Sequence, residues 1–169
     1  MTAPIRPALP DPPYEADEKT TLSSFLDWYR DVILRKVEGL SKEAATRSLV
    51  SSPTTLLGIV KHLACVERGW FQSGFMGERV YQPWSEADPD ADFRIELDES
   101  VVGITDLYRR EIERSRQIVD AANLDDHARR ADRATHTLRW VMVHMIEETA
   151  RHAGHMDILR EQTDGATGE

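Results

Sequence analysis

Four long stretches of the chain place apolar residues at steps of three and four, and this spacing is the feature that most constrains the fold. Spacing of this kind gives a helix one apolar face. No stretch sustains the apolar–polar alternation that a half-buried strand needs. We therefore expect an all-α protein in which four apolar faces pack together as a four-helix bundle.

Capping and turn-forming residues predict where these helices begin and end. The expected ranges are Glu18 to the interruption at 39–43, Pro53 to Gly77, about Leu97 to Ala122, and Leu138 to about Glu161. Ser52 is the expected N-cap of the second helix, with Pro53 at its first position, and Thr137 is the expected N-cap of the fourth. The loop between the second and third helices is long enough to form a crossover along the bundle, so strict up-down-up-down order is not required.

The two ends of the chain differ in composition from the region between them. Residues 1–15 hold five of the eight prolines and are expected to be extended. Residues 16–163 are expected to form the bundle, and residues 164–169 a flexible tail. We therefore expect one folded domain.

Charge and composition exclude several classes of partner. A net charge of -9 argues against nucleic acid and anionic membranes, which both require basic patches. No apolar run approaches the ~20 residues that span a bilayer, and the N-terminus lacks the apolar segment of a secretory signal. A single cysteine, Cys65, cannot form an internal disulfide and favours a reducing cytoplasm. A homodimer formed through outer helix faces is compatible with this pattern.

The fourth helix carries ionisable groups where apolar residues are expected. At about 100° per residue, the arc that holds Val141 and Leu159 also holds a set of four: His144, Glu148, His152 and His155. Burying a carboxylate with several imidazoles is costly unless a cation compensates. This arc therefore predicts a metal site.

A metal site needs ligands from more than one helix. Glu148 and His152 are spaced i, i+4 and can present two ligands to one ion. His62 lies at the edge of the apolar stripe of the second helix and is the candidate third ligand; the alternative is a hydrogen-bonded histidine at the core boundary. His127 and His136 lie among charged neighbours in a polar connection and are expected to be solvated.

Two segments resemble a known family. LLGIVKHLACVERGWF (56–71) and TLRWVMVHMIEETARHAGHMDILRE (137–161) are similar to the signature helices of the DinB-like four-helix-bundle superfamily, and more narrowly to its branch of mycothiol-dependent transferases. The resemblance extends over most of the chain after about residue 15.

The resemblance implies a ligand set and a thiol co-substrate. It implies one divalent metal held by His62, Glu148 and His152, with zinc as the expected ion and nickel, iron or manganese as alternatives. The superfamily often has glutamine at the position of His155, so this residue is a candidate acid/base group or a substituted ligand. His144 is left without a role by the resemblance.

The expected function follows from an ion with three protein ligands. Such an ion keeps an open position, where it can lower the pKa of a bound thiol. The resemblance implies that this thiol is mycothiol, activated for attack on an electrophile in detoxification or thiol metabolism. Trp70, Trp140 and Arg151 are the candidate cofactor-binding residues, whereas Cys65 is not expected to be a nucleophile.

The candidate cofactor-binding residues could have structural roles instead, and two other functions are compatible with the sequence. The tryptophans could serve core packing, and Arg151 could form an ion pair with Glu147 or Glu148. A maleylpyruvate isomerase-like enzyme would use the same metal and thiol, although isomerases of this family usually carry an extra C-terminal domain. A non-enzymatic, metal-binding, stress-associated bundle is the third interpretation.

Overall fold

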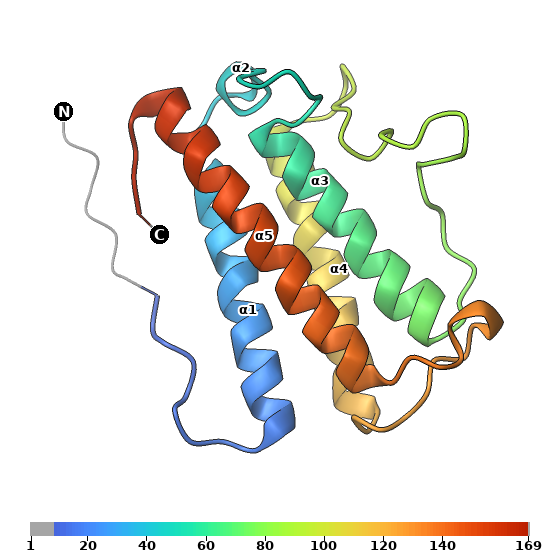
Figure 1. Ribbon diagram of the computed structural model, residues 1–169. Helices are drawn as coiled ribbons and strands as arrows, with labels where there is room; N and C mark the ends of the chain where they lie inside the picture. The colour runs from blue at the N-terminus through green and yellow to red at the C-terminus, as the bar shows by residue number, and fades with distance from the viewer. Residues whose placement is uncertain (1–8, 169) are drawn as a thin grey trace.

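The computed structural model describes residues 9–168 and consists of helices joined by loops (Figure 1). The helical segments are α1 (Glu18–Val37), α2 (Lys42–Ala45), α3 (Leu56–Glu67), the π-helix η1 (Arg68–Phe75), α4 (Val101–Ala121), the 3-10 helix η2 (Ala131–Arg133) and α5 (Leu138–Asp164). No strand occurs among the described residues. The prediction of an all-α bundle is confirmed.

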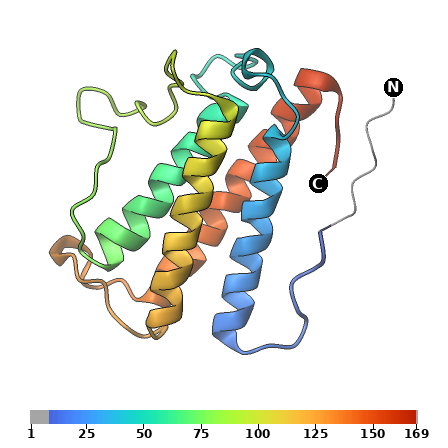
Figure 2. The same ribbon diagram turned by 180° about the vertical axis from the view of Figure 1, so that it is seen from behind.

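The four long helices are not ordered up-down-up-down. α1 and α5 run in one direction, and α3 and α4 run in the other (Figures 1 and 2). Because α3 and α4 are parallel neighbours, residues 76–100 must return along the length of the bundle before α4 begins. This long connection, here called the crossover loop, passes along the outer side of α3. The predicted crossover is therefore present.

The interior of the bundle divides into two apolar clusters. One lies between the second half of α1 and the first halves of α3 and α4, where Ile33, Leu57 and Tyr108 are buried completely. The other lies towards the opposite end, where Phe71 of η1 packs with Met142 of α5. α5 contributes to both clusters and crosses the junction between them at its middle. Side chains at that point have access to polar neighbours from several elements.

Each α-helix begins at a polar residue whose side chain accepts a backbone N–H of the first turn. Those residues are Asp17, Ser41, Thr55, Ser100 and Thr137. The prediction for Thr137 is confirmed, and the helix that starts there continues to Asp164 before Gly165 ends it with φ of 77°.

Two predicted helix starts are wrong by three or four residues. Ser52 does not cap α3; its hydroxyl bonds to Thr54 instead, and Thr55 accepts the N–H of Gly58 at 3.0 Å. Leu97 is fully exposed and lies before the Ser100 cap of α4. For α3 a local signal, Ser52 followed by Pro53, favoured the early start, whereas each helix begins after the residue that caps it, Thr55 or Ser100.

The end segments fit the expectation of little regular structure. Residues 9–16 contain no helix or strand, and residues 165–168 follow α5 without further helix. The first part of the predicted extended segment, residues 1–8, lies outside the described residues. The division at residues 15 and 163 stays a prediction.

Candidate metal centre

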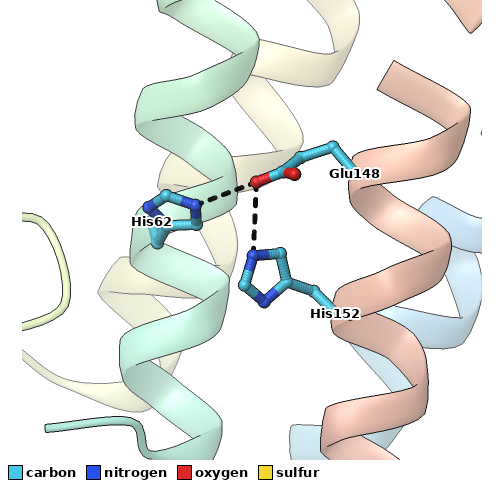
Figure 3. A group of neighbouring side chains, drawn as sticks. All are labelled: His62, Glu148 and His152. Atoms are coloured by element: carbon cyan, nitrogen blue, oxygen red, sulfur yellow. Dashed lines mark hydrogen bonds and ion pairs between the residues drawn. The ribbon is translucent and has the colours of Figure 1, made fainter. Parts of the chain in front are cut away.

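Three predicted ligands meet where α3 passes α5. His62 projects from α3, and Glu148 and His152 project from successive turns of α5, so that all three side chains point to one location (Figure 3). The i, i+4 spacing places the two α5 residues on one face of the helix. We call this set of residues the triad.

The ligand atoms of the triad converge closely. Glu148 Oε1 lies 3.3 Å from His62 Nε2 and 3.3 Å from His152 Nε2. One ligand atom from each residue lies within 4.8 Å of the other two. Two imidazole nitrogens and a carboxylate oxygen are a ligand set that suits zinc and related divalent ions. The chemistry of these residues therefore fits a metal ion.

The electrostatics of the triad also favour a bound cation. Hydrogen bonds from His152 and His62 hold the pKa of the Glu148 carboxyl well below its usual range, so it is an anion at neutral pH. Burial lowers the pKa of His62, but its hydrogen bonds to Asp92 and Glu148 outweigh burial and raise the pKa above 6.5. The anionic Glu148 therefore lies between the two imidazoles, and a divalent ion bound there would neutralise part of its charge.

Asp92, in the crossover loop, fixes the orientation of His62. Its Oδ2 accepts a hydrogen bond from His62 Nδ1 at 2.7 Å, and its side chain is almost completely buried. Phe93 stacks on the imidazole with ring centroids 4.1 Å apart and an interplanar angle of 17°. A carboxylate on the far nitrogen of a ligand histidine fixes its tautomer and makes it a stronger ligand. His62 Nε2 is therefore directed to the triad.

A glycine in α3 allows the crossover loop to approach so closely. A Cβ atom on Gly58 would lie 2.5 Å from the carbonyl oxygen of Phe93, which is too short for any contact. Only glycine leaves this space, so the placement of Asp92 and Phe93 depends on a residue one turn before His62 in α3. None of these three residues was predicted from the sequence, because no local pattern shows that the loop packs against Gly58.

The other predicted groups of α5 lie outside the triad. His144 packs between Trp70 and Trp140, with ring centroids at 4.4 and 5.2 Å. His155 is exposed, and its ring lies edge-on to that of His152 at 5.4 Å. The expectation that all four polar groups point inward is wrong for His155. The buried arc of α5 centres on Met145, Thr149 and Met156, so the triad lies at its edge and His155 lies beyond it.

The candidate cofactor-binding residues have other contacts as well. Trp70 is partly buried and Trp140 is 45% exposed; their rings lie 5.4 Å apart. Arg151 is exposed and forms ion pairs with Glu147 and Glu148. The ion pair expected as the alternative role of Arg151 is therefore present, and cofactor binding by these three residues stays a prediction.

One further expectation needs correction, and another agrees with the structure. His136 is not simply solvated, because its ring packs edge-on against Trp140 at 4.3 Å, whereas His127 is exposed as expected. Cys65 lies in the core. Burial raises the pKa of its thiol to about 11, so few thiolate anions form at neutral pH. This agrees with the expectation that Cys65 is not a nucleophile.

The structure thus defines a class of protein: an all-α bundle with a candidate metal site built from two histidines and one carboxylate on facing helices. The sequence profile of the mycothiol-S-transferase family matches residues 21–165, and the chain belongs to this family, a DinB-like one. The resemblance found in the sequence is confirmed. Comparison with curated proteins gives no match. No helix among the described residues is long and apolar enough to cross a membrane.

Proposed function

We propose that this protein is a metal-dependent thiol S-transferase that activates mycothiol for attack on a small electrophile. The observation that carries the proposal is the convergence of His62, Glu148 and His152 within a member of the mycothiol-S-transferase family. Zinc is the ion that we propose, because two imidazoles and one carboxylate leave a coordination position for a further ligand.

The residues of the chain prepare the site for this chemistry. Glu148 supplies negative charge that would neutralise part of the charge of the cation, and Asp92 keeps His62 Nε2 directed to the triad. When bound, a zinc ion would stabilise the thiolate form of a thiol at neutral pH. The buried thiol of Cys65 is not suited to replace that external thiol.

His155 is the proposed acid/base group. Its exposed imidazole lies against His152 and can exchange a proton with solvent beside the site. A cytoplasmic location, a role in detoxification and a homodimer stay predictions.

Metal analysis and thiol conjugation test the proposal together. The purified protein is titrated with zinc and then assayed for conjugation of mycothiol to monobromobimane, with and without zinc. We expect one zinc ion per chain and zinc-stimulated turnover, both lost in His152→Ala. His127→Ala, which changes an exposed histidine in the 122–137 connection, is the matched control and should keep both.

Three outcomes separate the interpretations. Failure to take up any divalent metal would rule out the site. Zinc binding without conjugation of mycothiol would leave a metal-binding bundle and rule out the transferase. Equal turnover in His152→Ala would show that the conjugation does not use the triad.

A further inference from the structure

We propose that a cleft beside the triad binds the electrophile and that Arg133 selects planar aromatic electrophiles carrying a carboxylate. The inference rests on the proposed function and names its class of substrate. It arises from residues beside the triad, and His62 is the one lining residue that belongs to the triad.

The cleft lies at the junction of three segments and shares one residue with the triad. It has a volume of about 270 Å³ and is lined by side chains of α3 and η1, of the crossover loop, and of η2. His62 is among the lining residues, so a molecule in the cleft lies next to the candidate metal site. The size suits a single substituted ring rather than a large ligand.

Aromatic side chains form much of the cleft wall. Trp70 of η1 and Trp84 of the crossover loop both line it, together with Phe93, which stacks on His62. The π-helix places Trp70 here while Phe71, the next residue, is buried in the core. Arg133 and His144 already pack against the Trp70 ring, so Trp84 is the wall that favours stacking with a planar, electron-poor ring. This predicts an aromatic ligand.

Arg133 adds a positive charge that forms no ion pair with a carboxylate among the described residues. Its guanidinium carbon lies 3.7 Å from the centroid of the Trp70 ring, and its Nη1 is buried without a hydrogen-bond partner. Across residues 9–168, no carboxylate forms an ion pair with Arg133. Asp92, the acidic residue that lines the cleft, already accepts a hydrogen bond from His62.

An arginine in this condition is suited to bind an anion. A buried, unpaired guanidinium nitrogen is costly, and a carboxylate satisfies it with charge-assisted hydrogen bonds. Other partly or fully buried arginines of the chain have such partners: Arg30 pairs with Glu67, and Arg68 pairs with Glu111. Arg133 differs from them because no carboxylate within residues 9–168 pairs with it, and a ligand carboxylate would supply that partner.

The segment that carries Arg133 is held in place before any ligand binds. The backbone N–H of Arg129 donates to the carbonyl of Phe75 at 2.7 Å, which fastens the segment to η1. The N–H of Ala128 donates to the carbonyl of His136 at 2.8 Å and closes the loop around η2. A preorganised arginine loses less entropy on binding than a mobile one. The structure therefore positions the cation for recognition.

Binding of unreactive probes tests the cleft without requiring turnover. The zinc-loaded protein is titrated with 3,5-dinitrobenzoate and with its uncharged analogue 3,5-dinitrobenzamide, and quenching of tryptophan fluorescence is measured. We expect the benzoate to bind about tenfold more tightly than the amide, as a charged hydrogen bond predicts. Arg133→Gln should abolish this preference, and Arg133→Lys should restore part of it.

Arg130→Gln is the matched control, because Arg130 lies three residues away, is exposed and pairs with Asp132. It should keep the preference for the benzoate. Zinc content and circular dichroism of each variant show that it is folded and loaded. Equal binding of the two probes by the unmodified protein, or an unchanged preference in Arg133→Gln, would overturn the inference.

Turnover of a matched pair of electrophiles then links the cleft to the reaction. With 4-chloro-3,5-dinitrobenzoate, the thiolate sulfur bonds to the ring carbon that carries chlorine, chloride leaves with the bonding electron pair, and the thiol proton passes to solvent. We expect Arg133→Gln to lower kcat/KM for the benzoate about tenfold relative to kcat/KM for the corresponding amide. The ratio of kcat/KM for the benzoate to kcat/KM for the amide is compared between the unmodified protein and Arg133→Gln. The difference in intrinsic reactivity of the two rings is the same in both proteins and therefore cancels.

The two assays distinguish failure of the inference from failure of the proposed function. Charge-dependent binding without turnover of either electrophile would leave the anion site in place and contradict the transferase. Turnover of both electrophiles with ratios unchanged by Arg133→Gln would support the transferase and contradict the role of Arg133.

Discussion

Two polar clusters share α3, and they differ in whether side chains of the protein alone satisfy their charges and hydrogen bonds. In the first, Arg30 of α1 donates to both oxygens of Glu67, at 2.8 and 2.7 Å, and both side chains are almost fully buried. In the second, the triad, two imidazoles approach one oxygen of Glu148 at 3.3 Å from a partly exposed position. The first pair satisfies its own charge, whereas the second gathers ligand atoms around a single point.

This difference separates a structural ion pair from a binding site. A bidentate arginine–carboxylate pair has short, well-directed hydrogen bonds, and here the remaining Nη1 of Arg30 donates to Asp27 at 2.8 Å, so side chains of the protein already satisfy the guanidinium. The longer contacts of the triad join groups that each keep electron pairs suited to a cation. The two clusters, which share α3, therefore predict different responses to mutation. Mutation of the first should lower stability, and mutation of the second should weaken metal binding.

The largest expected effect on stability comes from removing one partner of the closed pair. Glu67→Ala leaves the buried Arg30 guanidinium with Asp27 as its remaining carboxylate partner, which should lower the free energy of unfolding by about 3 kcal/mol. Urea unfolding measures this loss. Glu113→Ala, at an exposed position of α4, should change the free energy by less than about 0.5 kcal/mol.

A double substitution provides the sharper comparison for the same pair. Replacing Arg30 by Met and Glu67 by Leu removes both charges, and the double variant should be more stable than Glu67→Ala. Zinc stoichiometry should stay at one in every folded variant. If Glu67→Ala abolished zinc binding at full stability, the separation of the two clusters would be wrong.

The next effect concerns the residue that orients the triad. Asp92→Asn keeps the shape of the side chain but removes the carboxylate that holds His62 Nδ1, so zinc affinity should fall about 10- to 100-fold. Competition with a chelator of known affinity measures this change. Asp90→Asn, in the same loop but exposed, serves as the control. Unchanged affinity in Asp92→Asn would show that packing by Phe93 alone orients the imidazole.

The pH dependence of zinc binding should reflect the raised pKa of His62. A zinc ion competes with the proton on Nε2, so zinc affinity should fall about tenfold per pH unit for each proton displaced below that pKa. Isothermal titration calorimetry between pH 5.5 and about 8 measures the slope. An affinity that does not vary with pH in this range would exclude imidazole ligands.

In the zinc-free protein, the contribution of the triad to the free energy of unfolding should fall both when the pH is lowered and when it is raised. The raised pKa of His62 adds stability below about 6.5, which is lost as the pH rises through the folded value. The lowered pKa of Glu148 adds stability above about 4.5, which is lost on acidification towards the folded value. The triad therefore contributes most between these two pH values, and zinc should extend its contribution to higher pH. Urea unfolding with and without zinc measures this shift.

The smallest effect is expected from an exposed ion pair next to the triad. Arg151→Gln removes ion pairs of an exposed guanidinium with the exposed Glu147 and the partly buried Glu148, and it should change the free energy of unfolding by less than about 1 kcal/mol. A loss as large as that in Glu67→Ala would mean that Arg151 belongs to a buried network, contrary to its exposure. Urea unfolding in high and low salt distinguishes these cases.

Helical periodicity predicted the four long helices, and spacing together with family resemblance predicted the triad. The same periodicity misplaced the centre of the buried arc of α5, because a helical wheel shows which residues share a face but not which side the neighbouring helices cover. The start of α3 was misplaced because Ser52 satisfies the local rule for an N-cap as well as Thr55 does. Packing, rather than the cap itself, decides between them.

The sequence by itself determined the helices, their apolar faces and the i, i+4 pair of Glu148 and His152, because these depend on interactions within a few residues. Only the tertiary structure decided that Asp92 holds His62 and that Arg133 lies over Trp70 without a carboxylate partner. Those contacts join segments 30 and 63 positions apart in the chain, and they exist because the crossover loop returns along α3 and the 122–137 connection folds against η1. Sequence patterns within a few residues do not show which distant segments pack together. The orientation of His62 and the proposed selectivity of the cleft therefore depend on the tertiary fold.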